Sequence, residues 1–287
     1  MTTSGASERV AATQPGPALP AWLRTDNLAV PMLPALAHRV IELAADPEVT
    51  IPQLSAVVSK DQVLASRVLT LANSAYSAPS RTISSLNEAI VRLGTNAVRN
   101  VVITVSFTSR MQDPTIYGRH GRALVDHALG AAYAARLVAD RADVNVEEAF
   151  LYGLLHDIGK LIIYKLANDH QRKTRQPIAE EDVAAVIAAE HAALGAVALR
   201  RWKLPESLDA PVRFHHDYAA APEHGREAAV AYLANRLAHR YGFGCEAEDA
   251  DLLADPVCAL LGVDAAWLEA TDRRAPGLFE VARQALL

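Results

Sequence analysis

Apolar residues recur three and four positions apart through most of the chain beyond residue 33, which is the spacing of one helix face. Two stretches show the pattern most clearly: Leu36, Val40 and Leu43, then Leu64, Val68 and Leu71. Asp61 stands before the second stretch, where its carboxylate is expected to accept hydrogen bonds from the first amides of a helix. The pattern therefore predicts a succession of amphipathic helices.

Polar residues mark where some of these helices should begin and end. Thr50 with Gln53, and Ser85 with Glu88, have the spacing of a capping box at a helix N-terminus. Gly94 is a suitable residue to end the helix that Ser85 begins. These signals divide the first third of the chain into short helices.

One segment is open to two interpretations. Residues 101–107 are rich in β-branched side chains, as a strand would be, but no partner strand is evident, so a buried helix is expected. Further helices are expected over 122–140, after the cap Asn145, near 191–202 and 227–241, and as one or two small helices after Cys245. The predicted fold class is all-α.

Composition narrows the picture. The 287 residues are 51% hydrophobic and 21% charged, which is enough apolar material for a sizeable core. The net charge of −5 gives no electrostatic reason to expect nucleic acid as a partner. Cys245 and Cys258 form no Cys-x-x-Cys pair, and neither a membrane span nor a secretory signal is apparent. We therefore expect a cytoplasmic protein without a disulfide framework.

The residues most suggestive of chemistry are His156 and Asp157, which Lys160 follows. A buried charge is costly unless it is paired or bound to a metal ion. Adjacent residues on a regular helix diverge by about 100°, so a single ion would need further ligands from other helices. The chain offers four candidate ligands: His127, His191, His215 and His216. Imidazole and carboxylate ligands together suit zinc, iron or manganese.

A site of this kind would favour phosphate chemistry, since a bound divalent ion activates water and neutralises charge on a phosphoryl group. Asp157 and Lys160 are the expected catalytic residues, with Lys160 either orienting a phosphate or pairing with Asp157. The alternative is that the histidines are hydrogen-bonded core residues and that no metal is bound. On this alternative, His191 marks an exposed helix start. Three other histidines are expected at the surface: His170, His224 and His239.

Motifs along the chain add a family resemblance. They are Leu33 to Leu36, Ser59 to Leu64, Leu71 to Tyr76, Ile83 to Leu86, His191 with Gly195, Trp202 with Leu204-Pro205, and the doublet His215-His216. Together with His127 and His156-Asp157, this series resembles the HDOD domain, a signalling relative of the HD superfamily of metal-dependent phosphohydrolases. The resemblance covers roughly residues 31–241.

The resemblance implies a two-lobed helical domain over residues 28–241, with an N-terminal lobe at 28–115 and an HD-like lobe at 116–241. The remaining segments are 1–27, expected to be a disordered tail because it is rich in Ser, Thr, Ala, Gly and Pro, and 242–287, expected to be a helical extension. It also implies bacterial signalling through an unidentified protein partner.

The chain departs from the catalytic HD pattern at three positions. Asn235 occupies the place of the usual last Asp ligand, and a neutral amide should bind metal more weakly. No Gly-Tyr-Pro motif follows His216, and Ala123 supplies no carboxylate on the turn before His127.

Two functions therefore stay open. The first is a regulatory module that binds a protein or ligand at a degenerate pocket. The second is a metal-dependent phosphohydrolase or phosphodiesterase. The departures favour the first, and whether the chain is an enzyme is left undecided.

Overall fold

The computed structural model describes residues 23, 30, 32–74, 81–111, 113–118, 120–245, 247–248 and 251–286, and no strand occurs among them. The longer helices are α1 (Ala35–Ala45), α2 (Ile51–Val58), α3 (Gln62–Asn73), α4 (Leu86–Leu93), α5 (Thr95–Met111), α7 (His120–Ala142), α8 (Val146–Leu155), α9 (Ile158–Thr174), α10 (Glu180–Arg201), α12 (Gly225–Arg240) and α14 (Ala265–Leu286). Short helices are α6 (Pro114–Tyr117), α11 (Asp209–Arg213) and α13 (Pro256–Leu261), with 3-10 turns at Glu206–Leu208, Tyr218–Ala220 and Leu252–Ala254. The all-α prediction is confirmed.

The predicted caps begin the helices as expected. Asp61 accepts hydrogen bonds from the amides of Val63 and Leu64, and Asn145 does the same at the start of α8. Ser85 accepts from the amide of Glu88, and Gly94 ends α4 at a φ of 86°. Residues 101–107 lie within α5, so the helical interpretation of that β-branched segment was correct.

Asn73, part of the motif from Leu71 to Tyr76, has a structural role. Its amide nitrogen donates to the carbonyl of Ile83 at 2.8 Å, and its oxygen accepts from the Ile83 amide at 2.8 Å. These two hydrogen bonds tie the end of α3 to Ile83, just before α4 begins. Ala75 and Tyr76, the end of the motif, lie outside the described residues.

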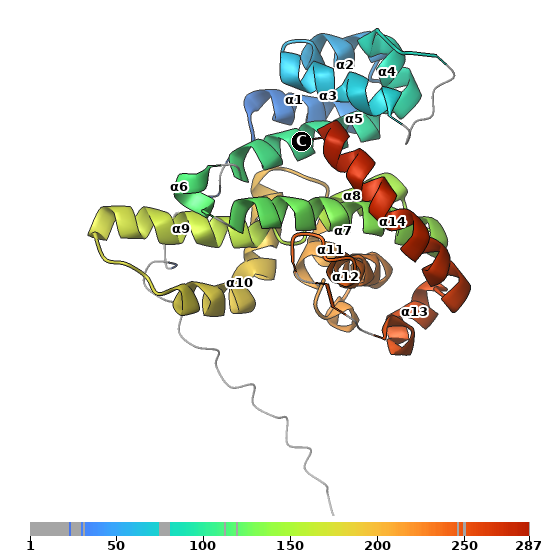
Figure 1. Cartoon of the computed structure of the whole chain (residues 1–287). Coiled ribbons are helices and arrows are strands. Elements are labelled where there is room, and N and C mark those ends of the chain that lie inside the picture. Colours follow the sequence, from blue (N-terminus) through green and yellow to red (C-terminus); the bar gives the residue numbers. More distant parts are fainter. Residues whose placement is uncertain are drawn as a thin grey trace, which may run out of the picture.

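The helices α1 to α4 gather at one end of the molecule, and α7 lies at the centre of the remaining helices (Figure 1). Helix α7 packs against α8 and α12, and α9 packs against α10. Helix α5 contacts both groups. So does α14, which crosses α7 diagonally and reaches α3 and α5 (Figure 1). The division into lobes at residue 115 stays a prediction, as does the disordered tail, whose residues lie outside the described ones except Leu23.

Two helices are longer than the sequence analysis predicted. Helix α10 begins at Glu180, eleven residues before His191, because three acidic residues at its first turn suit a helix N-terminus. The segment after Cys245 contains the 22-residue helix α14, whose apolar face is covered by α7. Cys245 and Cys258 are both free thiols.

Helix α10 bears on the expectation that the chain has no membrane span, which stays a prediction. The helix is long and apolar enough to span a membrane by length and composition alone, and it is one such helix among the described residues. Its side chains pack against α9 and α11, and His191 lies on its buried face. A buried core helix can have the same length and apolar composition, so the finding is weak support for a membrane span.

Candidate metal centre

His156 and Asp157 lie at a break between two helices. His156 ends α8 as its C-cap, and Asp157 precedes α9 as its N-cap with a φ of −98° and a ψ of 9°. The two side chains therefore do not diverge as they would on a regular helix, and His156 Nε2 lies 3.3 Å from Asp157 Oδ2. The divergence of about 100° expected on a regular helix therefore does not apply to this pair, and the break is what brings the two side chains together.

Two glycines let the neighbouring helices approach this break. A Cβ atom on Gly153 would lie 2.2 Å from the carbonyl oxygen of Ala131, and one on Gly159 would lie 1.8 Å from that of His191. Any larger residue would push α8 away from α7, or α9 away from α10. The close contacts place the ligands of α7 and α10 beside Asp157.

One group of side chains, which we call half-site A, consists of His127, His156 and Asn235 around Asp157 Oδ2. His127 Nε2 lies 3.2 Å from His156 Nε2, 3.0 Å from Asn235 Oδ1 and 3.7 Å from Asp157 Oδ2. All four residues are buried. They come from α7, the α8–α9 junction and α12, so residues separated by more than 100 positions in the chain meet here.

A second group, half-site B, consists of His191, His215 and His216 around Asp157 Oδ1. His191 Nε2 lies 3.3 Å from Asp157 Oδ1, 3.2 Å from His215 Nε2 and 3.1 Å from His216 Nε2. His191 and His215 are buried, whereas His216 is exposed. The alternative placement of His191 at an exposed helix start was wrong, because it lies in the middle of α10 on the face toward Asp157.

Backbone carbonyls fix the tautomer of four of these histidines. The Nδ1 atoms of His127, His156, His191 and His215 lie 3.1, 2.7, 2.6 and 2.8 Å from the carbonyl oxygens of Phe243, Gly153, Ile187 and Val212. Since a carbonyl only accepts, each Nδ1 carries the proton, and each neutral ring presents an unprotonated Nε2. Four lone pairs therefore point toward the oxygens of Asp157, which is the arrangement of metal-ligating histidines.

The distances between these atoms fit shared metal ions. Two ligands at about 2.1 Å from one ion, with roughly 90–110° between them, are roughly 3.0–3.4 Å apart. The His127–His156, His191–His215, His191–His216, His156–Asp157 and His191–Asp157 separations of 3.2, 3.2, 3.1, 3.3 and 3.3 Å all fall in this range. Asp157 faces both groups, so the residues present would fit two ions, one held by each half-site, with Asp157 available to both.

Asp157 itself has one unsatisfied oxygen. Its Oδ2 pairs with Lys160 Nζ at 2.5 Å, but its buried Oδ1 accepts no hydrogen bond among the described residues. Burial alone would raise the pKa of Asp157, yet His156 and the Lys160 ammonium hold that pKa well below its usual value. An ionised oxygen without a donor, next to unprotonated imidazole nitrogens, fits a cation.

Three histidines of the centre, His127, His215 and His216, are held neutral because their pKa values are lowered. Burial, with the neighbouring His156, lowers the pKa of His127 to about 4 and places that of His215 well below its usual value. Desolvation within the cluster and the neighbouring His191 lower the pKa of His216 to about 4. Neutral imidazole is the form that binds metal, so these three side chains, one in half-site A and two in half-site B, are ready to ligate at neutral pH.

A cleft of about 1050 Å³ opens onto both half-sites. Lys160 projects into it with 25% of its side chain exposed, beside His127, Asp157 and His191. The walls are formed by α6, α7, α9, α10 and the Gly244–Cys245 turn. A small phosphate-bearing molecule could therefore reach the metal ligands from this side.

The structure brings together all seven sequence-predicted ligands and Lys160: His127, His156, Asp157, His191, His215, His216 and Asn235. Two contributors were missed. His239, predicted at the surface, lies with its ring 4.9 Å from that of His127 and lines the cleft. It follows Asn235 by four positions, so the helical spacing could have indicated it. Phe243 acts through its carbonyl, which no side-chain motif reveals.

Solved structures with a similar fold support this architecture. A proposed metal-dependent phosphohydrolase from Shewanella amazonensis SB2B has a TM-score of 0.67 at 16% identity, covering 90% of this chain and 92% of its own. An HDOD domain protein of unknown function from Geobacter sulfurreducens has a TM-score of 0.66 at 22% identity, with 90% and 94% coverage. A proposed signal transduction protein from Marinobacter aquaeolei VT8 has a TM-score of 0.65 at 23% identity, with 90% and 60% coverage.

Comparisons of the sequence found two relatives and one matching family model. An uncharacterised protein of Treponema pallidum is 26% identical over 206 residues, or 68% of this chain, and the chain spans only 39% of that relative. A shorter match, 35% identical over 66 residues, is to ribonuclease Y of Thermosipho melanesiensis, covering 23% of this chain and 12% of that protein. The family model of the HDOD domain matches residues 30–218, which contain both half-sites except Asn235. The chain belongs to the HDOD domain family.

Proposed function

We propose that this chain is a regulatory HDOD protein whose centre holds two divalent metal ions and, through them, binds a phosphate-bearing ligand. The observation that carries the proposal is the convergence of four carbonyl-oriented imidazoles on the two oxygens of Asp157. A core that needed these histidines only for packing would not require all their Nε2 atoms to face one carboxylate. Two imidazoles beside one carboxylate oxygen and three beside the other favour iron, manganese or zinc over magnesium or calcium.

The metal ligands and Lys160 would have different roles in phosphate binding. When bound, the ions would supply positive charge for a phosphate group and lower the pKa of coordinated water. Lys160 lies at the cleft wall, 2.5 Å from Asp157, and its ammonium can turn toward a phosphate oxygen while staying on the same side of the centre. The regulatory role is supported by family membership and by Asn235, a neutral group where an anionic ligand would strengthen the site.

Metal analysis and phosphate binding test the proposal. Protein purified without chelator should contain close to two ions of iron, manganese or zinc per chain, and should bind inorganic phosphate in calorimetry. Both properties should disappear in the double variant His156→Ala/His191→Ala, whereas His224→Ala, an exposed histidine, should keep both. Folded wild-type protein that is metal-free and cannot be reconstituted with any of the three ions would overturn the proposal.

Hydrolysis of the bound phosphoester is the second candidate. It is favoured by one observation: half-site B has an exposed ligand, His216, so an ion there would be open to water as well as to the cleft. Metal-loaded protein would be incubated with a panel of phosphomonoesters and phosphodiesters. Turnover that is lost in Lys160→Gln without loss of metal supports an enzyme. Phosphate binding without turnover on the whole panel supports the regulatory role.

A further inference from the structure

The cleft extends well beyond the metal centre along one face of α9. Lys160, Tyr164, Asn168 and Gln171 follow each other by four, four and three positions, and all four line the cleft. At 1.5 Å per residue, the distance from Lys160 to Gln171 is roughly 16 Å. A phosphate at Lys160 would occupy only the inner end, so the outer part has room for the rest of a ligand.

An aromatic pair forms part of the outer wall. The rings of His120 and Tyr164 stack with centroids 5.2 Å apart and an interplanar angle of 16°, and both line the cleft. His120 Nε2 also lies 3.3 Å from Glu180 Oε1. The pair is thus held by α7, α9 and α10 together, about one helical turn from Lys160. A wall of this kind suits a flat ring, which stacks with its π-face.

A polar group without a partner lies one turn farther out. The amide nitrogen of Asn168 is buried and has no acceptor among the described residues, although Asn168 lines the cleft. A buried donor without an acceptor is unfavourable. Rotation of this amide toward the cleft would let it donate to a carbonyl oxygen or ring nitrogen of a bound molecule. Stacking and an edge-on hydrogen bond would then act on the same flat group.

The charges of the cleft limit the size of the phosphate part. Among the described residues that line it, Lys160 is the one Lys or Arg, and Glu180 lies near the outer end. A polyphosphate or a nucleic-acid backbone would need further cations along the wall. The lining instead continues with apolar side chains, including Leu124 and Ile187. One phosphate group joined to an uncharged flat ring matches this distribution.

We infer that His120, Tyr164 and Asn168 form a ring subsite that binds the nucleobase of a nucleoside monophosphate whose phosphate lies at Lys160. The inference rests on the proposed function for the phosphate end only. The base would extend the aromatic stack, and an acceptor on its edge would take the hydrogen bond of Asn168. The sugar would span the turn of α9 between Lys160 and Tyr164.

Nucleosides without phosphate test the ring subsite separately from the metal centre. Chelator-treated protein would be titrated with adenosine, guanosine, cytidine, uridine and ribose. At least one nucleoside should bind, and ribose should not. Tyr164→Leu should weaken that binding about tenfold or more, the size of one lost base stack, while Tyr164→Phe should keep it. Tyr218→Leu, outside this cleft, is the control. Asn168→Leu should weaken nucleoside binding through loss of the hydrogen bond to the base, while the stacked rings of His120 and Tyr164 stay in place.

A second set of binding measurements uses metal-loaded protein. Nucleoside monophosphate should bind at least tenfold more tightly than ribose 5-phosphate, and Tyr164→Leu should abolish the difference without lowering metal content. If inorganic phosphate binds but no nucleoside does, and the two monophosphates bind equally, the ring subsite is overturned and the proposed function stands. If nucleosides bind but phosphate does not, the ring subsite stands and the proposed function fails.

Discussion

Half-sites A and B share Asp157 but differ in their surroundings. Half-site A is enclosed by α7, α8 and α12, and its fourth ligand candidate is the neutral Asn235. Half-site B has three histidines, one of which, His216, is exposed. Enclosure favours slow exchange of an ion, and a neutral amide lowers its affinity, whereas a third imidazole raises affinity at an open position. The difference teaches that two adjacent sites on one carboxylate need not bind metal equally.

Loss of the shared carboxylate should empty both half-sites, so that no difference between them is left to measure. Asp157→Ala takes one ligand from each half-site, so metal content should fall from about two ions per chain to nearly none. Asp169→Ala is the matched control, because Asp169 lies on α9, which Asp157 caps, and its carboxylate pairs with Lys165 away from the metal centre. Mass spectrometry of the metals gives the measurement. Retention of one ion in Asp157→Ala would show that the half-sites do not depend on a common ligand.

Two single variants, each lacking one histidine of one half-site, should show that the half-sites bind metal independently. His156→Ala should lose the ion of half-site A and keep that of half-site B, and His191→Ala should do the reverse, since no His belongs to both groups. The affinity for the remaining ion should fall by less than the 10–100-fold typical of a lost supporting group. Calorimetric titration of manganese into chelator-treated variants measures each. Loss of both ions in either variant would mean that the two bind only together.

Acid should destabilise the metal-free protein through the enclosed half-site. The pKa of His127 is about 4 in the folded chain and about 6.5 when unfolded, so the unfolded chain binds the extra proton between these values. The free energy of unfolding should therefore fall as pH drops from 6.5 to 4, by on the order of 3 kcal/mol from this residue. Urea unfolding at several pH values tests this. His127→Gln should flatten the profile and His224→Gln should not.

Replacement of Asn235 by an acidic residue should raise the metal affinity of half-site A, whereas the preceding substitutions lower the metal content. Asn235→Asp restores an anionic ligand beside His127 and should raise the manganese affinity of half-site A by about tenfold, or roughly 1.4 kcal/mol. Half-site B should not change. Asn145→Asp makes the same chemical change at a helix cap where either residue serves. An unchanged affinity in Asn235→Asp would show that this side chain is not a ligand.

Local features of the fold could be predicted from the sequence. Asp61, Ser85 and Asn145 cap their helices because each needs only its own next few amides. The ligand types were also predictable, since residues such as His156 and Asp157 carry their chemistry in the side chain.

Features that depend on packing could not be predicted. The break at Asp157 depends on the contacts of α8 and α9 with their neighbours, and a helical pattern does not reveal it. The depth of His191 follows from the close approach that Gly159 permits. The carbonyl of Phe243 belongs to a turn whose position is set by other helices.

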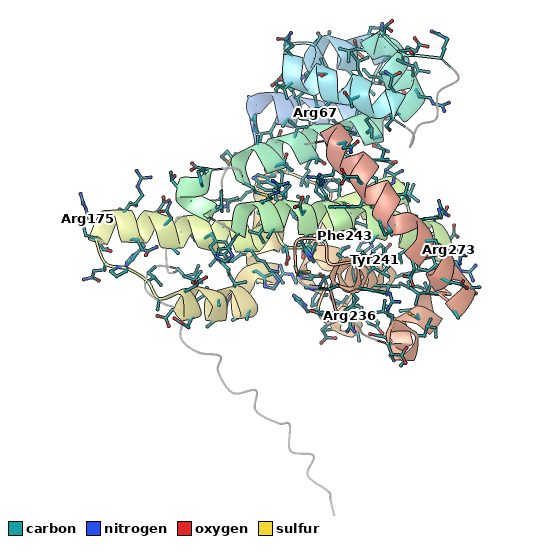
Figure 2. All side chains as sticks on the ribbon, viewed as in Figure 1. Arg67, Arg175, Arg236, Tyr241, Phe243 and Arg273 are labelled. Carbon is teal, nitrogen blue, oxygen red and sulfur yellow. The ribbon has the colours of Figure 1, made fainter. Side chains whose placement is uncertain are left out.

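That turn links the last helix of the chain to the metal centre. Tyr241 and Phe243 follow α12 beside α14 (Figure 2), and the ring of Phe243 stacks on Phe279 of α14 with centroids 4.0 Å apart. The carbonyl of the same Phe243 orients His127. If the centre binds metal as proposed, docking of α14 and metal binding would therefore be coupled, and linkage would make the coupling reciprocal. A partner that pulls α14 from α7 would weaken half-site A, and an ion there would hold α14 in place by the same factor.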